Sequence, residues 1–296
     1  MEASCLSGDA GLSATEIDNP GGENVESWSG KDRGDENFPV GSALIRADLR
    51  AHVHAYYAFA RNADDIADSA ELAPADKIAR LDVMQDVLLG RRDHGSPSSL
   101  KLRASLAETG VTTAHATDLL IAFRQDATKH RYASWDELYD YCVHSAMPVG
   151  RYVLDVHGEA SATRAPSDAL CASLQVLNHL QDCAKDLSAI GRCYLPADLM
   201  ERFGTGIPDL TGQRENAGLR RVFDTLLDRV DILNKAAAEL PGRTRDRRLR
   251  LEIAIIVGMA HRLARRLREA DPIAGRVKLT KGDSVSSAFA ALRFLP

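Results

Sequence analysis

The chain lacks the features that would place it in a membrane or outside the cell. No run of apolar residues is long enough to span a bilayer, and the N-terminus has no basic region followed by an apolar one. The five cysteines are an odd number and show no CxxC or Cys/His metal-binding spacing. We therefore expect a soluble cytoplasmic protein whose cysteines stay reduced, with Cys142 and Cys171 in the core.

The chain also lacks the alternation of apolar and polar residues that marks β-strands. From Asn37 onward, apolar residues recur at spacings of three and four, and Pro and Gly interrupt them at intervals typical of helix connections. The sequence predicts an all-α fold in one domain, residues 35–296. Residues 1–34, rich in Gly, Ser, Asp and Glu, are predicted to be a disordered tail. The expected helices include Leu100–Ala107, Ala114–Lys129, Trp135–Val156, Asp168–Leu187, Leu219–Leu240 and Arg248–Ala270.

The charge distribution bears on partners. A net charge of −5 argues against nucleic acid. Arginines are nevertheless concentrated at 243–250 and 261–268, where helical spacing favours solvated or carboxylate-paired faces. Weak attraction to an anionic membrane, such as the inner face of the cell membrane, is the lesser alternative, as is contact with another pathway enzyme. The oligomeric state stays open.

Two pairs of aspartates with the same spacing are the most informative feature: Asp64 with Asp68, and Asp182 with Asp186. Residues four apart lie on one face of a helix, so each pair of carboxylates repels unless a cation lies between them. A solvated helix face is the alternative explanation for either pair alone. Each pair, however, continues a polar stripe, formed by Tyr57 and Arg61 before the first pair and by Gln175 and Asn178 before the second.

Mg²⁺ is the cation that this pattern favours. It takes oxygen ligands, retains several waters and commonly joins one or two carboxylates to substrate phosphates. Two facing acidic helices therefore predict a diphosphate held through metal ions.

At these residues the chain resembles the squalene and phytoene synthase family, whose two aspartate-rich motifs lie on opposed helices. The resemblance covers roughly Asp35 to Lys281, and Gly191–Pro196 looks like the basic, aromatic segment that follows the second motif. It implies a helical isoprenoid synthase bundle with a central cleft and an isoprenoid diphosphate substrate. It also implies two or three Mg²⁺ ions, bound by Asp64, Asp68, Asp182 and Asp186.

The resemblance further implies roles for other residues. Arg61, Gln175, Asn178, Arg192 and Arg276 are expected to bind the substrate, with Arg192 as a flexible lid over the diphosphate. The π faces of Tyr57, Tyr141 and Tyr194 are expected to stabilise a carbocation, with Tyr141 in a cleft wall formed by Trp135–Val156. A tyrosine in a helical stripe is also a common core residue. Asp65 is expected to face away from the cleft or to support it from behind.

Departures from the family pattern indicate the branch. The segment Glu36–Ser42 lacks serine at the positions where the family usually has it, and Lys185 replaces an acidic residue often found in the second motif. The chain is most similar to the hydroxysqualene synthase branch of bacterial hopanoid biosynthesis, which converts presqualene diphosphate and water to hydroxysqualene. The alternatives are condensation of two farnesyl diphosphates to presqualene diphosphate, a phytoene-type reaction, and a non-catalytic helical partner subunit.

Other cofactors have no motif here. No Gly-rich dinucleotide fingerprint follows a strand, so NADPH is not expected. A carboxylate-bridged di-iron bundle would need Glu-x-x-His pairs, and none occurs in a convincing position.

Overall fold

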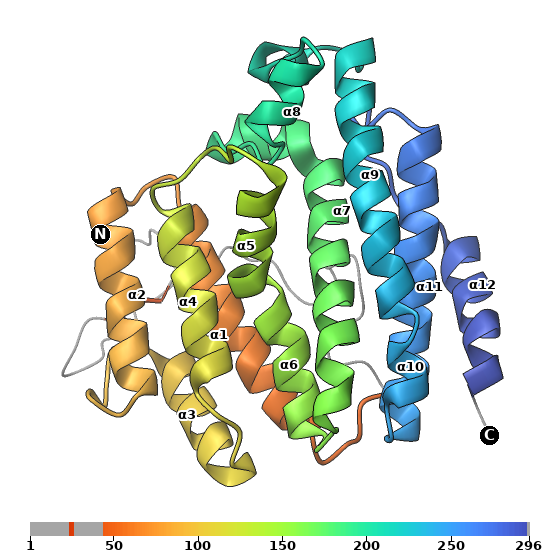
Figure 1. The fold of residues 1–296 in the computed structure, drawn as a ribbon. Helices are drawn as coiled ribbons and strands as arrows, with labels where there is room; N and C mark the ends of the chain where they lie inside the picture. The colour runs from red at the N-terminus through yellow and green to blue at the C-terminus, as the bar shows by residue number, and fades with distance from the viewer. Residues whose placement is uncertain (1–23, 27–43, 295–296) are drawn as a thin grey trace, which may run out of the picture.

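The computed structural model describes residues 24–26 and 44–294 of the chain. Within these ranges it contains helices and no β-strand, as the sequence predicts (Figure 1). None of the described helices is both long and apolar enough to cross a membrane. The α-helices are α1 Arg50–Asp68, α2 Pro74–Leu88, α3 Pro97–Thr109, α4 Ala114–Asp126, α5 Trp135–Ser145, α6 Met147–Val156, α7 Arg164–Ile190, α8 Ala197–Arg202, α9 Ala217–Ala237, α10 Leu240–Arg243, α11 Arg247–Glu269 and α12 Lys281–Ala291.

The long helix α7 organises the bundle. It packs against α6 on one side and against α9 and α11 on the other, and α12 lies at the outer edge on α11 (Figure 1). Helix α1 packs against α2, α3, α4 and α6. Two apolar clusters result, one centred on α7, α9 and α11 and the other on α1 to α4. Each of the two acidic motifs therefore lies on a helix that is anchored in a different cluster.

The single helix predicted over residues 135–156 is two helices in the structure. Helix α5 ends at Ser145, and α6 begins at Met147 with Pro148 in its first turn. Pro148 has no N–H to donate to the carbonyl group four residues earlier, whereas the first turn of a helix tolerates proline. The prediction was wrong here because the apolar pattern runs through the break.

Gly150 sets the distance between α6 and α7. A Cβ atom at this position would lie 2.5 Å from Ser167 Oγ and 2.6 Å from Cys171 Sγ, both on α7. These separations are below van der Waals contact, so a side chain here would require Ser167 and Cys171 to rotate away or the two helices to separate.

Gly191 ends α7 and redirects the chain. Its φ of 67° lies in the left-handed region, which favours glycine. The following segment then lies against the connection after α4, where Cys193 N–H donates to the His130 carbonyl at 3.0 Å and Ala197 N–H donates to the Tyr132 carbonyl at 2.9 Å. This turn carries Arg192 toward the C-terminal end of α4.

Three residues of the segment predicted as a tail, Asn24, Val25 and Glu26, are described by the structure. Val25 N–H donates to the Gly95 carbonyl at 2.9 Å, and Glu26 Oε1 accepts from Ser98 N–H at 2.6 Å and from Ser96 Oγ at 2.7 Å. Glu26 thus places a negative charge at the N-terminus of α3, where the helix dipole favours it. The rest of the predicted tail and the segment Glu36–Ser42 lie outside the described residues.

Candidate active site

An apolar cavity of about 410 Å³ lies between α1, α6, α7, α10 and α11. Its apolar lining includes Val53 from α1, Val153 from α6, Leu170 from α7 and Ile256 from α11. Arg61 and Asp64 of the first motif are among the few charged residues that line it. An apolar chain can therefore occupy the cavity with a polar head at the acidic motif. Tyr57 also lines the cavity, as does Cys171, which was expected in the core.

The first acidic pair is organised by Arg61. Its guanidinium lies 3.0 Å from Asp64 Oδ2 and 2.6 Å from Asp65 Oδ1. Asp65 is buried, so it supports Arg61 from behind, one of the two positions expected for it. Burial, and then the charge of Asp68, raise the pKa of Asp64 to about 8. The Asp64 side chain keeps 34% of its surface exposed, so a cation can reach this electrostatically strained carboxylate.

The second acidic pair lies on α7 and faces the first. Asp182 is held by Arg276, whose Nε lies 2.7 Å from Asp182 Oδ1 and whose second nitrogen lies 2.8 Å from Oδ2. Burial, and then Asp182, raise the pKa of Asp186 to about 6, and the charge of Asp68 across the cleft contributes to the rise. The two motifs are therefore close enough for their carboxylates to repel each other.

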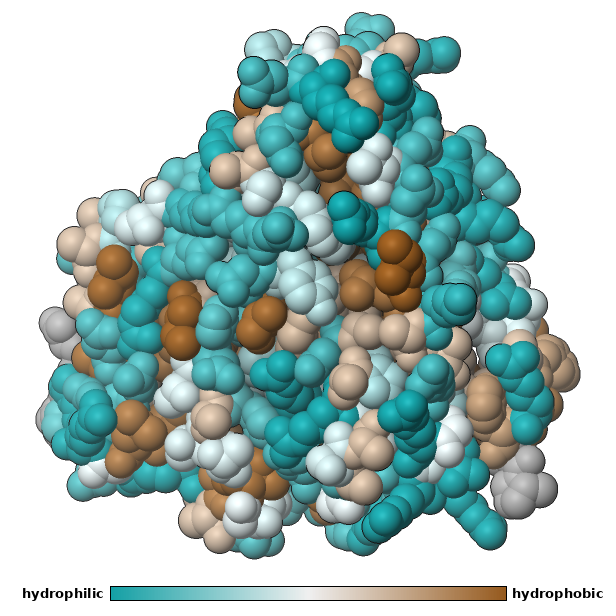
Figure 2. Space-filling model, in the orientation of Figure 1, coloured by the Kyte–Doolittle hydropathy of each residue, from teal (hydrophilic) through white to brown (hydrophobic). Residues whose placement is uncertain are grey.

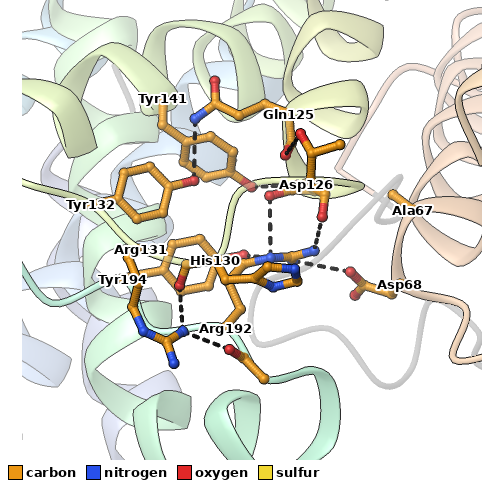
Figure 3. A network of polar contacts seen from close by, with 12 residues as sticks. Ala67, Asp68, Gln125, Asp126, His130, Arg131, Tyr132, Tyr141, Arg192 and Tyr194 are labelled. Carbon is orange, nitrogen blue, oxygen red and sulfur yellow. Dashed lines mark hydrogen bonds and ion pairs between the residues drawn. The ribbon is translucent and has the colours of Figure 1, made fainter. Parts of the chain in front are cut away.

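Arg192, which follows α7, contacts residues of α1 and α4 (Figure 3). Its guanidinium donates to Asp68 Oδ1 at 3.1 Å, to the Tyr194 hydroxyl at 2.9 Å and to the backbone carbonyl of Asp126 at 2.8 Å. The residue is only 3% exposed. The expectation of a flexible lid was wrong, because buried hydrogen bonds and an ion pair fix this side chain within the protein.

Asp126 is a site residue that the sequence analysis missed. Tyr141 Oη donates to its Oδ2 at 2.8 Å, and Arg192 Nε lies 3.5 Å from its Oδ1. Burial raises the pKa of Asp126 to about 7, although Arg192 and the Tyr141 hydroxyl oppose the rise. Asp126 is the last residue of α4 and belongs to no acidic pair, so no local pattern could have indicated it.

Tyr141 and Tyr194 lie in a buried aromatic cluster. Tyr194 stacks on His179 with ring centroids 3.5 Å apart, and Tyr141 lies at 5.6 Å from Tyr194. Neither tyrosine lines the cavity. The segment Trp135–Val156, which includes Tyr141, was expected to form a cleft wall. Only its second half does so: Val149, Gly150, Val153 and Leu154 of α6 line the cavity, whereas no residue of α5 lines it.

Gln175 and Asn178 are half-buried on α7, on the face that carries the second acidic pair. Gln175 Nε2 lies 3.3 Å from His179 Nε2. Burial, and then Arg192, lower the pKa of His179 to about 3, so the imidazole is neutral and accepts from the Gln175 amide.

The donor set fits Mg²⁺ shared with a diphosphate better than a metal held by protein alone. Among residues 24–26 and 44–294, no three His, Cys, Asp or Glu side chains lie close enough together to hold an ion. Burial, and then the neighbouring carboxylates, raise the pKa values of Asp64 and Asp186, so the charged form of each is disfavoured without a further cation. Mg²⁺ that takes one or two carboxylates and completes its shell with phosphate oxygens and water would supply this charge.

Comparison with known proteins agrees with this geometry. The family model described as squalene/phytoene synthase matches residues 31–283. A hydroxysqualene synthase of Rhodopseudomonas palustris is 44% identical over 264 residues, covering 89% of this chain and 90% of the relative. One from Zymomonas mobilis is 41% identical over 265 residues, covering 89% of each chain.

Solved structures show the same fold. A squalene synthase, HpnC, from Alicyclobacillus acidocaldarius superposes with a TM-score of 0.69 at 31% identity, covering 78% of this chain and 87% of the other. A dehydrosqualene synthase superposes with a TM-score of 0.74 at 21% identity, covering 88% and 91%. The chain therefore belongs to the squalene/phytoene synthase family, whose helical isoprenoid synthase fold it shares.

Proposed function

We propose that this protein converts presqualene diphosphate and water to hydroxysqualene and diphosphate, as a carbon–oxygen lyase of squalene and hopanoid biosynthesis. The observation that carries the proposal is the apolar cavity with Arg61 and Asp64 in its lining, at a cleft where two acidic helices face each other. The hydroxysqualene synthases at 41–44% identity support this branch. A phytoene synthase of Mycobacterium tuberculosis is 34% identical over only 57% of the chain.

The proposed reaction needs no redox partner. The bond between carbon and the diphosphate oxygen breaks, and its electron pair leaves with the diphosphate. The resulting cyclopropylcarbinyl cation rearranges with opening of the ring, water adds through its oxygen, and one proton is released. Asp64, Asp68, Asp182 and Asp186 would hold Mg²⁺, which when bound neutralises the charge of the departing diphosphate.

The protein's own residues would bind the diphosphate and protect the carbocation. Arg276 is exposed and paired with Asp182 of the second motif, so its guanidinium lies where a diphosphate would bind. Arg192 is buried and paired with Asp68 of the first motif, so it would add positive charge to the site from a fixed position. The apolar lining excludes water from most of the cation's path, and the Tyr57 ring offers a π face without a strong nucleophile.

The test is to incubate purified protein and Mg²⁺, without NADPH, with presqualene diphosphate and separately with farnesyl diphosphate, and to identify products by mass spectrometry. The proposal expects hydroxysqualene from the first and no consumption of the second. Consumption of farnesyl diphosphate alone would assign the protein to the condensing branch instead. Turnover of neither substrate, with Mg²⁺ and pyrophosphate giving no protection against unfolding, would favour a non-catalytic subunit.

A further inference from the structure

In the C-terminal helix α12, polar and small residues face the bundle and large apolar residues face outward, the reverse of the usual arrangement at the edge of a bundle. Its buried positions are Asp283, Ser287 and Ala291, with 7%, 0% and 1% exposure. Its large apolar side chains point outward: Val285 is 54% exposed, Phe289 is 70% exposed, and Leu292, just after the helix, is 48% exposed. A surface helix normally buries its apolar stripe against the core. The outer face of α12 is thus suited to a partner other than the bundle.

Specific contacts hold α12 in this orientation. Arg266 of α11 lies 2.7 Å from Asp283, and Arg262 donates to Ser286 Oγ at 2.5 Å. A Cβ atom at Gly258 of α11 would lie 3.2 Å from both the Cβ and Oγ atoms of Ser287, so the two helices approach closely there. The outward stripe is therefore a stable feature of the surface, and not the result of a loosely attached helix.

Cations flank this stripe. Lys281 and Arg293 are exposed at the two ends of α12: Lys281 lies four residues before Val285 and shares its helix face, and Arg293 lies in the short 3-10 helix Leu292–Phe294 directly after α12. The one acidic residue of α12, Asp283, faces inward and is paired with Arg266. We define the docking face as Lys281, Val285, Phe289, Leu292 and Arg293. In Figure 2, apolar side chains are visible at the edge of the molecule that α12 occupies.

We propose that this docking face binds the surface of an anionic lipid bilayer, with Val285, Phe289 and Leu292 inserted among the acyl chains and Lys281 and Arg293 at the headgroups. Amphipathic helices bind in this way by combining apolar burial with attraction to anionic lipids. A second copy of the chain fits less well. In an antiparallel pairing of two α12 helices, Lys281 of one copy would lie beside Arg293 of the other. Three apolar side chains are also few beside the roughly 20–30 residues that each partner contributes to a standard protein interface.

The experiment is co-sedimentation of the full chain with two kinds of vesicle, one of phosphatidylcholine alone and one of phosphatidylcholine mixed with phosphatidylglycerol. Wild type should bind the mixed vesicles more tightly, and added salt should weaken this binding. The double variant Val285→Ser/Phe289→Ser should lose at least about tenfold in partitioning, because both apolar side chains leave the bilayer. The variant Lys281→Gln/Arg293→Gln should lose the preference for phosphatidylglycerol.

The matched control is Ile232→Ser on α9, where an isoleucine is 66% exposed outside the docking face. It should bind vesicles like wild type. All variants change exposed residues, so their thermal unfolding by circular dichroism should match wild type. Equal sedimentation of Val285→Ser/Phe289→Ser and wild type would overturn the proposal, as would absence of wild-type binding to either vesicle. A dimer in light scattering that Phe289→Ser dissociates would assign the face to a second copy. No substrate is present, so the result is independent of the proposed reaction.

Discussion

Arg192 and Asp68 lie 124 residues apart in the chain, and their side chains meet at 3.1 Å. This contact joins the segment after α7 to the C-terminal end of α1, so one buried guanidinium ties the segment that follows the second motif's helix to the first acidic motif (Figure 3). Two carboxylate motifs facing each other without a cation would repel. Arg192 stabilises the arrangement before substrate binds, and the same charge is available to a diphosphate.

Replacing Asp126 should weaken this arrangement. Asp126→Asn removes the negative charge beside buried Arg192 but keeps an oxygen that can accept from Tyr141. Burial raises the pKa of Asp126 to about 7, so its charged form is disfavoured in the folded state, and we expect the free energy of unfolding of Asp126→Asn at pH 8 to be higher than that of wild type. Turnover of presqualene diphosphate should fall by roughly 10–100-fold, because Arg192 loses the charged side chain that helps to hold it beside Asp68. Denaturant unfolding and product formation measure the two effects.

The control for this prediction is Asp118→Asn, which lies two turns earlier on α4 and is half-buried. It should leave both quantities near wild type. The variant Tyr141→Phe combined with Asp126→Ala should lower turnover by less than the product of the two single effects, because either change alone breaks the hydrogen bond between Tyr141 and Asp126. Single effects that multiply in the double variant would show that Tyr141 and Asp126 act separately.

The acidic site should make the ligand-free protein less stable as pH rises. The pKa values of Asp64 and Asp126 are raised from 3.8 to about 8 and about 7, so the folded state binds more protons than the unfolded state up to about pH 8. The free energy of unfolding should therefore fall as pH rises between 6.5 and 8. Histidine with a lowered pKa, such as His179, acts in the opposite direction only below its ordinary value of 6.5.

Two measurements check this pH dependence. Asp64→Asn should reduce the slope and stabilise the ligand-free protein at pH 8, while lowering turnover by at least about 100-fold if Asp64 holds Mg²⁺ that neutralises the departing diphosphate. Mg²⁺ with pyrophosphate should reduce the same slope in wild type, because the ion compensates the carboxylates. A wild-type stability that rises from pH 6.5 to 8 would contradict the prediction.

Gly150 should be sensitive to the addition of a side chain. Gly150→Ala places a Cβ atom 2.5 Å from Ser167 Oγ and 2.6 Å from Cys171 Sγ, so these two side chains must rotate or α6 must move away from α7. We expect a cost of about 1–3 kcal/mol in the free energy of unfolding, as for other overpacked cores. Gly242→Ala is the matched control, since a Cβ atom there would have no neighbour within 4 Å. Similar unfolding midpoints for the two variants would show that α6 adjusts freely.

Lys185 should weaken the affinity of the second motif for Mg²⁺. It is exposed on α7 beside Asp186, and its charge lowers the pKa of that carboxyl against the larger effects of burial and Asp182. Lys185→Glu should reduce the Mg²⁺ concentration needed for half-maximal turnover by roughly two- to five-fold, a modest effect because the side chain is exposed. The Mg²⁺ concentration for half-maximal turnover of Lys185→Gln should lie between those of Lys185→Glu and wild type. An unchanged Mg²⁺ dependence in Lys185→Glu would remove any role of Lys185 in tuning the site.

Local periodicity was enough to predict the helices and the two acidic motifs. Residues at i and i+4 share a helix face whatever surrounds them, so Asp64 and Asp68 on α1, and Asp182 and Asp186 on α7, could be predicted as two polar faces. The predicted helix over residues 135–156 failed at Pro148 because one proline ended a pattern that otherwise continued.

Tertiary structure alone decided which residues meet across the cleft. Asp126 comes from a segment with no distinguishing local pattern, and it becomes a neighbour of Arg192 because Gly191 turns the chain back toward the end of α4. The same packing buried Arg192, which the sequence suggested as a mobile lid, and turned Val285 and Phe289 outward on α12. Burial depends on all the elements that surround a side chain, whereas a helical pattern records only its immediate neighbours in the chain.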